Sequence, residues 1–366
     1  MRHRIEGRKP ALDVERRPVE VTHMLNFASD ASNNEIDPLT RLAIRHGTDK
    51  WGQHFYTPVY HGLFVHMRDK PVRLLEIGVG GYGFSKAGGA SLAMWADYFP
   101  NGHIVGIDIF AKKLELGPRV QVYQGSQDDP TFLSYISKEH GPFDIVIDDG
   151  SHIPNHVVAS FNILFPMLAD CGLYVIEDVQ TSFLPQFGGS ALDGGATINL
   201  AKTILEHLNH AEIKIVHPKR QVADFVKCIR SFRAYHNIFV IEKGDNTEPS
   251  NFDYRLDNVH AAHALRTIKH ELKQSPTAEG YANLIDLYLC AHSLPEAWAV
   301  VNEALEKWPH HPGVLAAAYM AAVQSGNVQH KLDFLRRLVA LDADNAELRS
   351  LLRKSEAEAA STASSS

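Results

Sequence analysis

Residues 143–152 read FDIVIDDGSH, an apolar and β-branched run that ends abruptly in two carboxylates, a glycine and a histidine. Such a run is typical of a buried strand in a parallel sheet. Open α/β sheets bind their ligands at the carboxyl ends of the strands. The stretch therefore predicts an α/β fold with its chemistry next to Asp149 and His152.

A second predicted strand, residues 172–176 (GLYVI), also ends in two acids, Glu177 and Asp178. Neighbouring strands lie about 4.8 Å apart, so acids at their ends converge if the two strands pair. We predict that Asp149, Glu177 and Asp178 bind a metal, and oxygen ligands of this kind favour Mg²⁺. The alternative is that these acids cap helices or contact solvent.

His152 follows Asp149 by three residues, on the loop after the strand. Its ordinary pKa of about 6.5 allows it to accept a proton near neutrality. A metal beside it would acidify a bound hydroxyl, so we predict catalytic roles for His152 and Asp149. The alternative is a surface or packing histidine, and the 21 histidines of the chain lower the weight of any single one.

A glycine-rich turn follows the first predicted strand, 72–77 (VRLLEI), and reads GVGGYG at 78–83. Glycines between a strand and a helix let the backbone approach a ligand, and we expect Gly78 and Gly80 to do so. The next predicted strand, 103–107, ends in Asp108, which suits the two hydroxyls of a ribose. The alternative is that Asp108 caps a loop.

A third predicted strand, 120–123, precedes GSQDDP. Ser126 and Gln127 either meet an adenine edge or form the turn before a helix at 130–138. Upstream, residues 37–70 are rich in aromatics and predict a helical cap on the sheet or a lid whose Lys50 and Tyr56 face a ligand. We also expect Asp148 to contact a cofactor bound at this edge of the sheet.

The remaining elements alternate between helices and strands, which predicts a doubly wound, mostly parallel sheet over residues 71–243. We expect helices at 154–168 and 196–209 and strands at 213–217 and 237–243. The Gly-rich segment after Asp178 predicts a substrate-facing loop.

The pattern changes beyond residue 243. Residues 244–253 have the composition of a linker, and 254–357 are helical with a weak repeat of about 34 residues, which is the tetratricopeptide period. Two such units are few, so we expect them to pack on the sheet domain or on a second subunit of a homo-oligomer. We expect residues 1–36 to form an arm and 358–366 a disordered tail.

Composition argues against several classes of protein. The net charge is −7 without a concentrated basic stretch, which argues against a nucleic-acid partner. The three cysteines show no metal or disulfide spacing. No apolar run approaches the roughly 20 residues that span a bilayer. We expect a cytoplasmic protein with no membrane partner.

Several motifs resemble the metal-dependent sugar O-methyltransferases of macrolide biosynthesis, such as the mycinamicin and tylosin deoxysugar enzymes. These motifs are LLEIGVGG, GGASLAMW, YFP, IDIF, GPFDIVIDDGSH and GLYVIEDVQT, and GTDK with HFYTPVY resembles the cofactor-covering segment of that family. The resemblance spans about residues 47–189, and the C-terminal helical repeat departs from it.

The resemblance implies a class I S-adenosylmethionine-dependent fold, Mg²⁺, and a sugar hydroxyl of a glycoside as methyl acceptor. It implies that Glu76, Gly78 and Gly80 hold the methionine part of the cofactor and that Asp108 holds the ribose. Two other functions fit parts of the sequence. The glycine spacing allows an NAD-dependent nucleotide-sugar oxidoreductase or epimerase, and the helical repeat allows a non-catalytic interaction protein.

Overall fold

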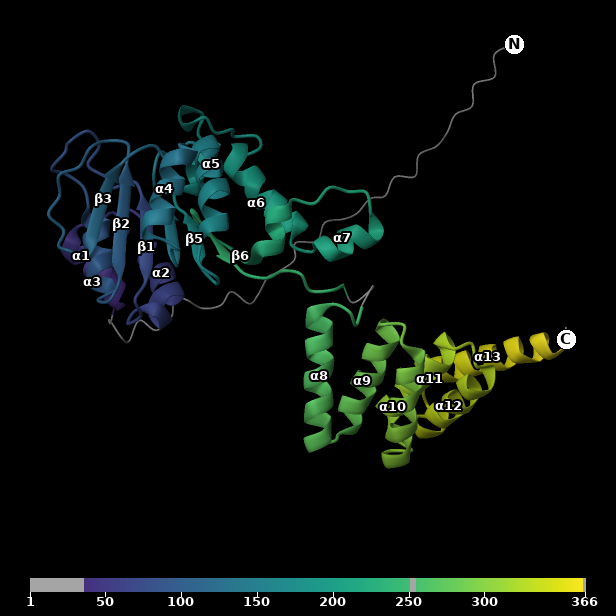
Figure 1. The fold of residues 1–366 in the computed structure, drawn as a ribbon. Coiled ribbons are helices and arrows are strands. Elements are labelled where there is room, and N and C mark those ends of the chain that lie inside the picture. The colour runs from purple at the N-terminus through teal and green to yellow at the C-terminus, as the bar shows by residue number, and fades with distance from the viewer. Residues whose placement is uncertain (1–35, 251–254, 365–366) are drawn as a thin grey trace, which may run out of the picture.

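The computed structural model describes residues 36–250 and 255–364, so the predicted arm lies outside the described residues apart from Ile36. The described chain has a part built on a β-sheet and a part built of helices alone (Figure 1). No helix in the described ranges is both long enough and apolar enough to cross a membrane.

Seven strands form one sheet in the order β3-β2-β1-β4-β5-β7-β6. The strands are β1 (Arg73–Ile77), β2 (His103–Asp108), β3 (Val120–Gln124), β4 (Ile145–Asp148), β5 (Leu173–Ile176), β6 (Ile229–Tyr235) and β7 (Ile238–Lys243). The first five are parallel, and β7 is antiparallel to both β5 and β6. The predicted mostly parallel α/β sheet is confirmed. The strand order reverses between β1 and β4, which is where such sheets bind ligands.

Helices cover both faces of this sheet (Figure 1). They are α1 (Pro38–His46), α2 (Thr57–Phe64), α3 (Ala90–Tyr98), α4 (Pro130–His140), α5 (Pro154–Leu164) and α6 (Gly195–His207). A further helix, α7 (His210–Val216), follows α6 and has no buried residue. Successive strand residues face opposite sides, so Leu74 packs with Tyr60 and Trp95 while Leu75 packs in a second core with Phe161. The cap segment is thus part of the core.

One predicted strand is wrong, and one strand was missed. Residues 213–217 belong largely to helix α7, which has no buried residue. The alternating apolar pattern of this segment is typical of a strand. A central strand would have buried side chains, and this surface segment has none. The edge of the sheet is instead β6, whose Arg233 pairs with Glu242 of β7 at 2.8 Å. Its polar side chains concealed β6 from a search for apolar runs.

The C-terminal part consists of α8 (Val259–Gln274), α9 (Ala278–Cys290), α10 (Leu294–Lys307), α11 (Pro312–Gln324), α12 (Val328–Leu341) and α13 (Ala346–Ser364). Helices α9, α11 and α13 begin at residues 278, 312 and 346, so each begins 34 residues after the one before. Helices α10 and α12, at 294 and 328, have the same spacing. The repeat length is therefore confirmed, while its assignment to the tetratricopeptide class stays a prediction.

The two predicted boundaries of the helical part differ from the structure in detail. Asn246, inside the predicted linker, donates its side chain to the carbonyls of Leu208 and Val226, so the linker begins bonded to the sheet domain. The predicted disordered tail is wrong at its start, because α13 continues to Ser364. Its alanines and glutamates favour helix.

Candidate active site

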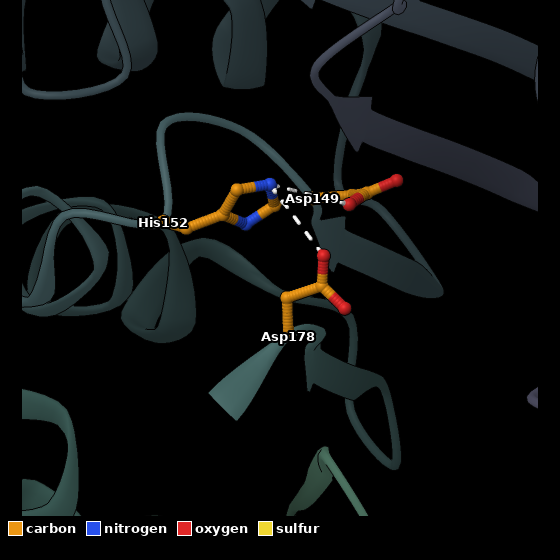
Figure 2. Close-up of side chains that lie close together, drawn as sticks. All are labelled: Asp149, His152 and Asp178. Atoms are coloured by element: carbon orange, nitrogen blue, oxygen red, sulfur yellow. Dashed lines mark ion pairs between the residues drawn. The ribbon is translucent and has the colours of Figure 1, made fainter. Parts of the chain in front are cut away.

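Two neighbouring strands bring acids to one edge of the sheet. Strands β4 and β5 pair in parallel, with Asp148 opposite Ile176, so the residues that follow them emerge side by side. Asp149, His152 and Asp178 gather there, with one ligating atom from each lying within 4.8 Å of the others. Nε2 of His152 lies 4.0 Å from Oδ1 of Asp149 and 3.7 Å from Oδ2 of Asp178 (Figure 2).

The backbone at this edge is conformationally unusual. His152 and Asp178 both have positive φ, at 56° and 51°. Such conformations cost a non-glycine residue of order 1–3 kcal/mol and persist where the surroundings impose them. The Thr181 hydroxyl lies 3.2 Å from the carbonyl of His152 and 2.7 Å from that of Asp178, as a donor to both. The two loops are thereby tied together.

Glu177, the third predicted metal ligand, lies in a different contact. Its side chain is buried, and its Oε1 is 2.7 Å from Nζ of Lys50 and also accepts a short hydrogen bond from Tyr60. Burial, followed by the charge of Asp149, raises the pKa of Glu177 well above its usual value. Its role as a metal ligand stays a prediction, because in the structure its carboxylate forms an ion pair with Lys50.

Lys50 is the centre of this contact. Its ammonium also lies 2.8 Å from Oδ2 of Asp149 and 3.1 Å from Oε1 of Glu76. Burial alone would lower the pKa of Lys50, but Asp149, Glu177 and Glu76 together raise it well above its ordinary value, so the side chain is charged. Glu76, at the end of β1, is fully buried and also accepts from Ser91 at 2.8 Å.

The segment between α1 and α2 covers the site. Tyr56 donates its hydroxyl to Oδ1 of Asp178 at 2.6 Å, and Nδ1 of His54 lies 3.6 Å from the same oxygen. The two rings stack, with centroids 4.7 Å apart. Burial would raise the pKa of Asp178, but hydrogen bonds from Tyr56 and Gln180 outweigh burial and lower it, so this carboxylate is ionised.

The glycine turn after β1 lies against the loop after β4, which carries Asp149. Gly78 has a φ of +93°, and a Cβ placed on it would lie only 2.1 Å from the carbonyl oxygen of Asp149. Asp108 fixes the turn, because its carboxylate accepts from the amide of Val79 at 3.0 Å and from that of Phe110 at 2.8 Å. Gly80 also has positive φ, at 73°.

Three of the predicted cofactor residues bond chiefly to protein groups. Gln127 bridges two loops, because its Nε2 donates to Asp148 at 3.1 Å and its Oε1 accepts from the amide of Ser151 at 2.6 Å. Asp148 is buried and also accepts from the hydroxyls of Ser160 and Tyr174, so its carboxylate faces protein donors. Burial raises the pKa of Asp148 to about 6. Ser126 donates to Asp128.

Sequence reasoning placed Lys50 and Tyr56 near a ligand but missed three features of this segment. It did not find the contact of Lys50 with three acids, the bond from Tyr60 to Glu177, or the approach of His54 to Asp178. A lysine within an aromatic-rich segment was the one available signal, because a buried lysine requires a buried acid.

No family model matches the chain. A Streptomyces olivaceus 8-demethyl-8-(2-methoxy-alpha-L-rhamnosyl)-tetracenomycin-C 3'-O-methyltransferase is 42% identical over 61% of this chain and 60% of its own length. The mycinamicin VI 2''-O-methyltransferase of Micromonospora griseorubida is 44% identical over 57% of this chain and 53% of its own length. The chain thus spans somewhat more than half the length of these relatives.

Solved structures give the same answer. The MycE methyltransferase of the mycinamycin biosynthetic pathway, in complex with Mg and SAH, has a TM-score of 0.57 and 39% identity, covering 63% of this chain and 61% of its own. A complex of the same methyltransferase that also holds mycinamycin VI has a TM-score of 0.54 and 41% identity, covering 58% and 55%. The sheet-bearing part of this chain is therefore a class I methyltransferase fold, homologous to the sugar O-methyltransferases of tetracenomycin and macrolide biosynthesis.

Proposed function

We propose that this protein is an S-adenosylmethionine-dependent, divalent-metal-dependent O-methyltransferase that methylates a sugar hydroxyl of a glycoside. One observation carries the proposal. Two ionisable acids and a histidine, Asp149, Asp178 and His152, come together within 4.8 Å at the carboxyl edge of the sheet. Relatives that are 42–44% identical are named sugar O-methyltransferases, and a solved relative contains Mg and SAH.

The residues at this edge fit a hard divalent ion. Asp149 and Asp178 offer carboxylate oxygens, the ligand type that Mg²⁺ prefers, and few protein ligands leave positions for water or substrate. Glu177 is the further predicted ligand and lies one residue before Asp178. When bound, the ion would lower the pKa of a sugar hydroxyl and fix its orientation.

His152 is the proposed proton acceptor. Its side chain is partly exposed, at 22%, and its Nε2 faces the two acids that would hold the ion. The ring also meets Phe187 edge to face, with centroids 6.2 Å apart. A hydroxyl bound beside these acids would thus lie next to Nε2, and such placement of the reacting groups supplies much of the rate.

The glycine turn is the proposed place of the cofactor. At Gly80 a Cβ position has only the Cα of Gly88 nearby, at 3.9 Å, so a ligand can approach the backbone there, while at Gly78 the carbonyl of Asp149 fills that space. Asp108 would bind the ribose, because each of its oxygens keeps a lone pair beyond the one given to a backbone amide. Glu76 is proposed to contact the methionine part of the cofactor. Tyr56, in the segment that covers the site, is proposed to contact the cofactor as well.

The loop after Asp178 supports an acceptor with an apolar portion. It comprises two short turns, η3 (Val179–Phe183) and η4 (Pro185–Phe187), and its Phe183, Leu184 and Leu192 are exposed. A sugar at His152 would place the remainder of a glycoside on this loop. A cytoplasmic location and assembly into a homo-oligomer through α8–α13 remain part of the proposal.

Transfer of labelled methyl from S-adenosylmethionine to a panel of glycosides tests the proposed function. We expect labelled product with Mg²⁺, loss of product with EDTA, and recovery when Mg²⁺ is restored. A parallel thermal-shift experiment should show stabilisation by S-adenosylhomocysteine. Stabilisation by NAD alone would favour the oxidoreductase alternative instead.

A further inference from the structure

Lys50 joins three carboxylates that come from three different strands. Glu76 lies in β1, Asp149 follows β4, and Glu177 follows β5; we refer to these three side chains as the acid pocket. The ammonium lies 3.1, 2.8 and 2.7 Å from them, respectively. The lysine itself is 1% exposed, so water does not reach the carboxylates in place of its ammonium group.

Without this ammonium the acid pocket would leave three carboxylates in a largely dry site with no cation beside them, so each could stay charged only at a cost. Removing one partner of a buried ion pair destabilises a protein strongly, because a buried charge is left uncompensated. A cation at this point therefore stabilises the folded, metal-free protein. The chain supplies it from the loop between α1 and α2, 99 residues before Asp149 and 127 before Glu177.

Asp149 connects this ammonium to the proposed metal site. Its Oδ2 contacts Lys50, while its Oδ1 lies on the side of His152, 4.0 Å from Nε2. One carboxylate therefore has a fixed cation on one oxygen and the position of a divalent ion near the other. A bound ion and the ammonium would then both act on Asp149.

We propose that Lys50 is a tethered cation that stands in for metal charge, so that the acid pocket and the α1–α2 cap fold before a divalent ion binds. The proposal rests on the proposed function, because it concerns the metal of that site. Its consequence is that loss of the lysine charge makes folding dependent on the metal. A lysine that only filled space would not have this effect.

Thermal unfolding of wild type and Lys50→Met, each in EDTA and in Mn²⁺, tests the proposal. Methionine keeps most of the side-chain volume and removes the charge. In EDTA we expect Tm to fall by on the order of 10 °C, the size expected for an uncompensated buried charge. We expect Mn²⁺ to raise the Tm of the variant by at least about twice the rise in wild type, because the ion then neutralises the pocket alone.

Lys243→Met is the matched control, because Lys243 donates to the carbonyls of Pro166 and Leu168 and touches no carboxylate of the pocket. Its Mn²⁺ shift should equal that of wild type. The double variant Lys50→Met/Glu177→Gln removes one negative charge together with the lysine, so in EDTA it should be more stable than Lys50→Met alone.

Equal Mn²⁺ shifts in wild type and Lys50→Met would overturn the proposal. A double variant that is less stable in EDTA than Lys50→Met would also overturn it. The same holds if the double variant fails to fold both with and without Mn²⁺. Binding of Mn²⁺ to wild type, followed by electron paramagnetic resonance, distinguishes failure of the proposed function from failure of the role proposed for Lys50. If wild type binds no Mn²⁺, the proposed function fails; if it binds Mn²⁺ but the shifts are equal, only the role of Lys50 fails.

Discussion

Nε2 of His152 lies 3.7 Å from Oδ2 of Asp178, and both residues have left-handed backbone conformations. Residues of this kind are held by their surroundings at a cost, and such costs concentrate at functional sites. The pair brings a proton acceptor and a carboxylate from two different loops to one point.

Replacing His152 by Asn should lower kcat by about 10²–10⁴-fold, the range for loss of a general base. Asparagine tolerates positive φ, so the loop should keep its conformation. Binding of S-adenosylhomocysteine, measured by calorimetry, should be unchanged. His156→Asn is the control, since His156 contacts Asp128 and Ser151 rather than Asp149 or Asp178. Full turnover in His152→Asn would remove the histidine from the proposed role.

Replacing Tyr56 by Phe removes the hydrogen bond that the hydroxyl donates to Asp178 at 2.6 Å. Groups that orient a metal-binding carboxylate typically contribute 10–100-fold to metal affinity. We expect the Kd for Mn²⁺ to rise by about 10-fold, measured by electron paramagnetic resonance. Tyr123→Phe, which loses only a bond to Gln121, should leave the Kd unchanged. An unaltered Kd in Tyr56→Phe would contradict a metal-binding Asp178.

Replacing Gly78 by Ala should destabilise the protein and abolish cofactor binding. The added Cβ would lie 2.1 Å from the carbonyl of Asp149 at a φ of +93°, which costs at least about 2–3 kcal/mol. Urea unfolding measures the loss. Gly62, in helix α2, has open space around its Cβ position, so Gly62→Ala should be neutral or stabilising by up to about 1 kcal/mol.

The contribution of Asp148 to the stability of the protein should fall as the pH rises from about 4 to 6. Burial raises the pKa of Asp148 in the folded protein from 3.8 to about 6, so the folded state keeps a proton that the unfolded state releases. The stabilisation is fully present below the unfolded pKa and is lost as pH rises through 6; about two pKa units correspond to roughly 3 kcal/mol.

Replacing Asp148 by Asn should remove this component of the pH dependence. An Asn amide can replace the protonated carboxyl, because the Ser160 and Tyr174 hydroxyls can turn to accept from it. Urea unfolding between pH 4.5 and 7.5 compares the two proteins. A difference between them that does not change with pH would contradict the raised pKa of Asp148.

Much of the sheet could be predicted from sequence because its central strands are apolar runs that end in charge. The acids after the runs at 145–148 and 173–176 converge only if the two runs pair, and the structure pairs them in parallel. The edge was harder to predict. Strand β6 carries Arg230 and Arg233, and α7 has strand-like text on a surface without buried residues, so pattern and burial disagreed in both places.

The candidate site was predicted as a set of residue types, and the structure supplies the pairing among them. Asp149, His152 and Asp178 do gather. That Glu177 pairs with Lys50 could not be read, because 127 residues separate them and their pairing depends on how the cap packs on the sheet. The bonds of Asp148 with Ser160 and Tyr174 are likewise products of packing across three elements.

The proposed metal site is formed by Asp149, which follows β4, and Asp178, which follows β5. An anomalous difference map from a crystal grown with Mn²⁺ and S-adenosylhomocysteine tests it most directly. We expect one strong peak within about 2.3 Å of carboxylate oxygens of Asp149 and Asp178, close to the distance for hard divalent ions. A map with its peak elsewhere, or with none at these two residues, would contradict the account.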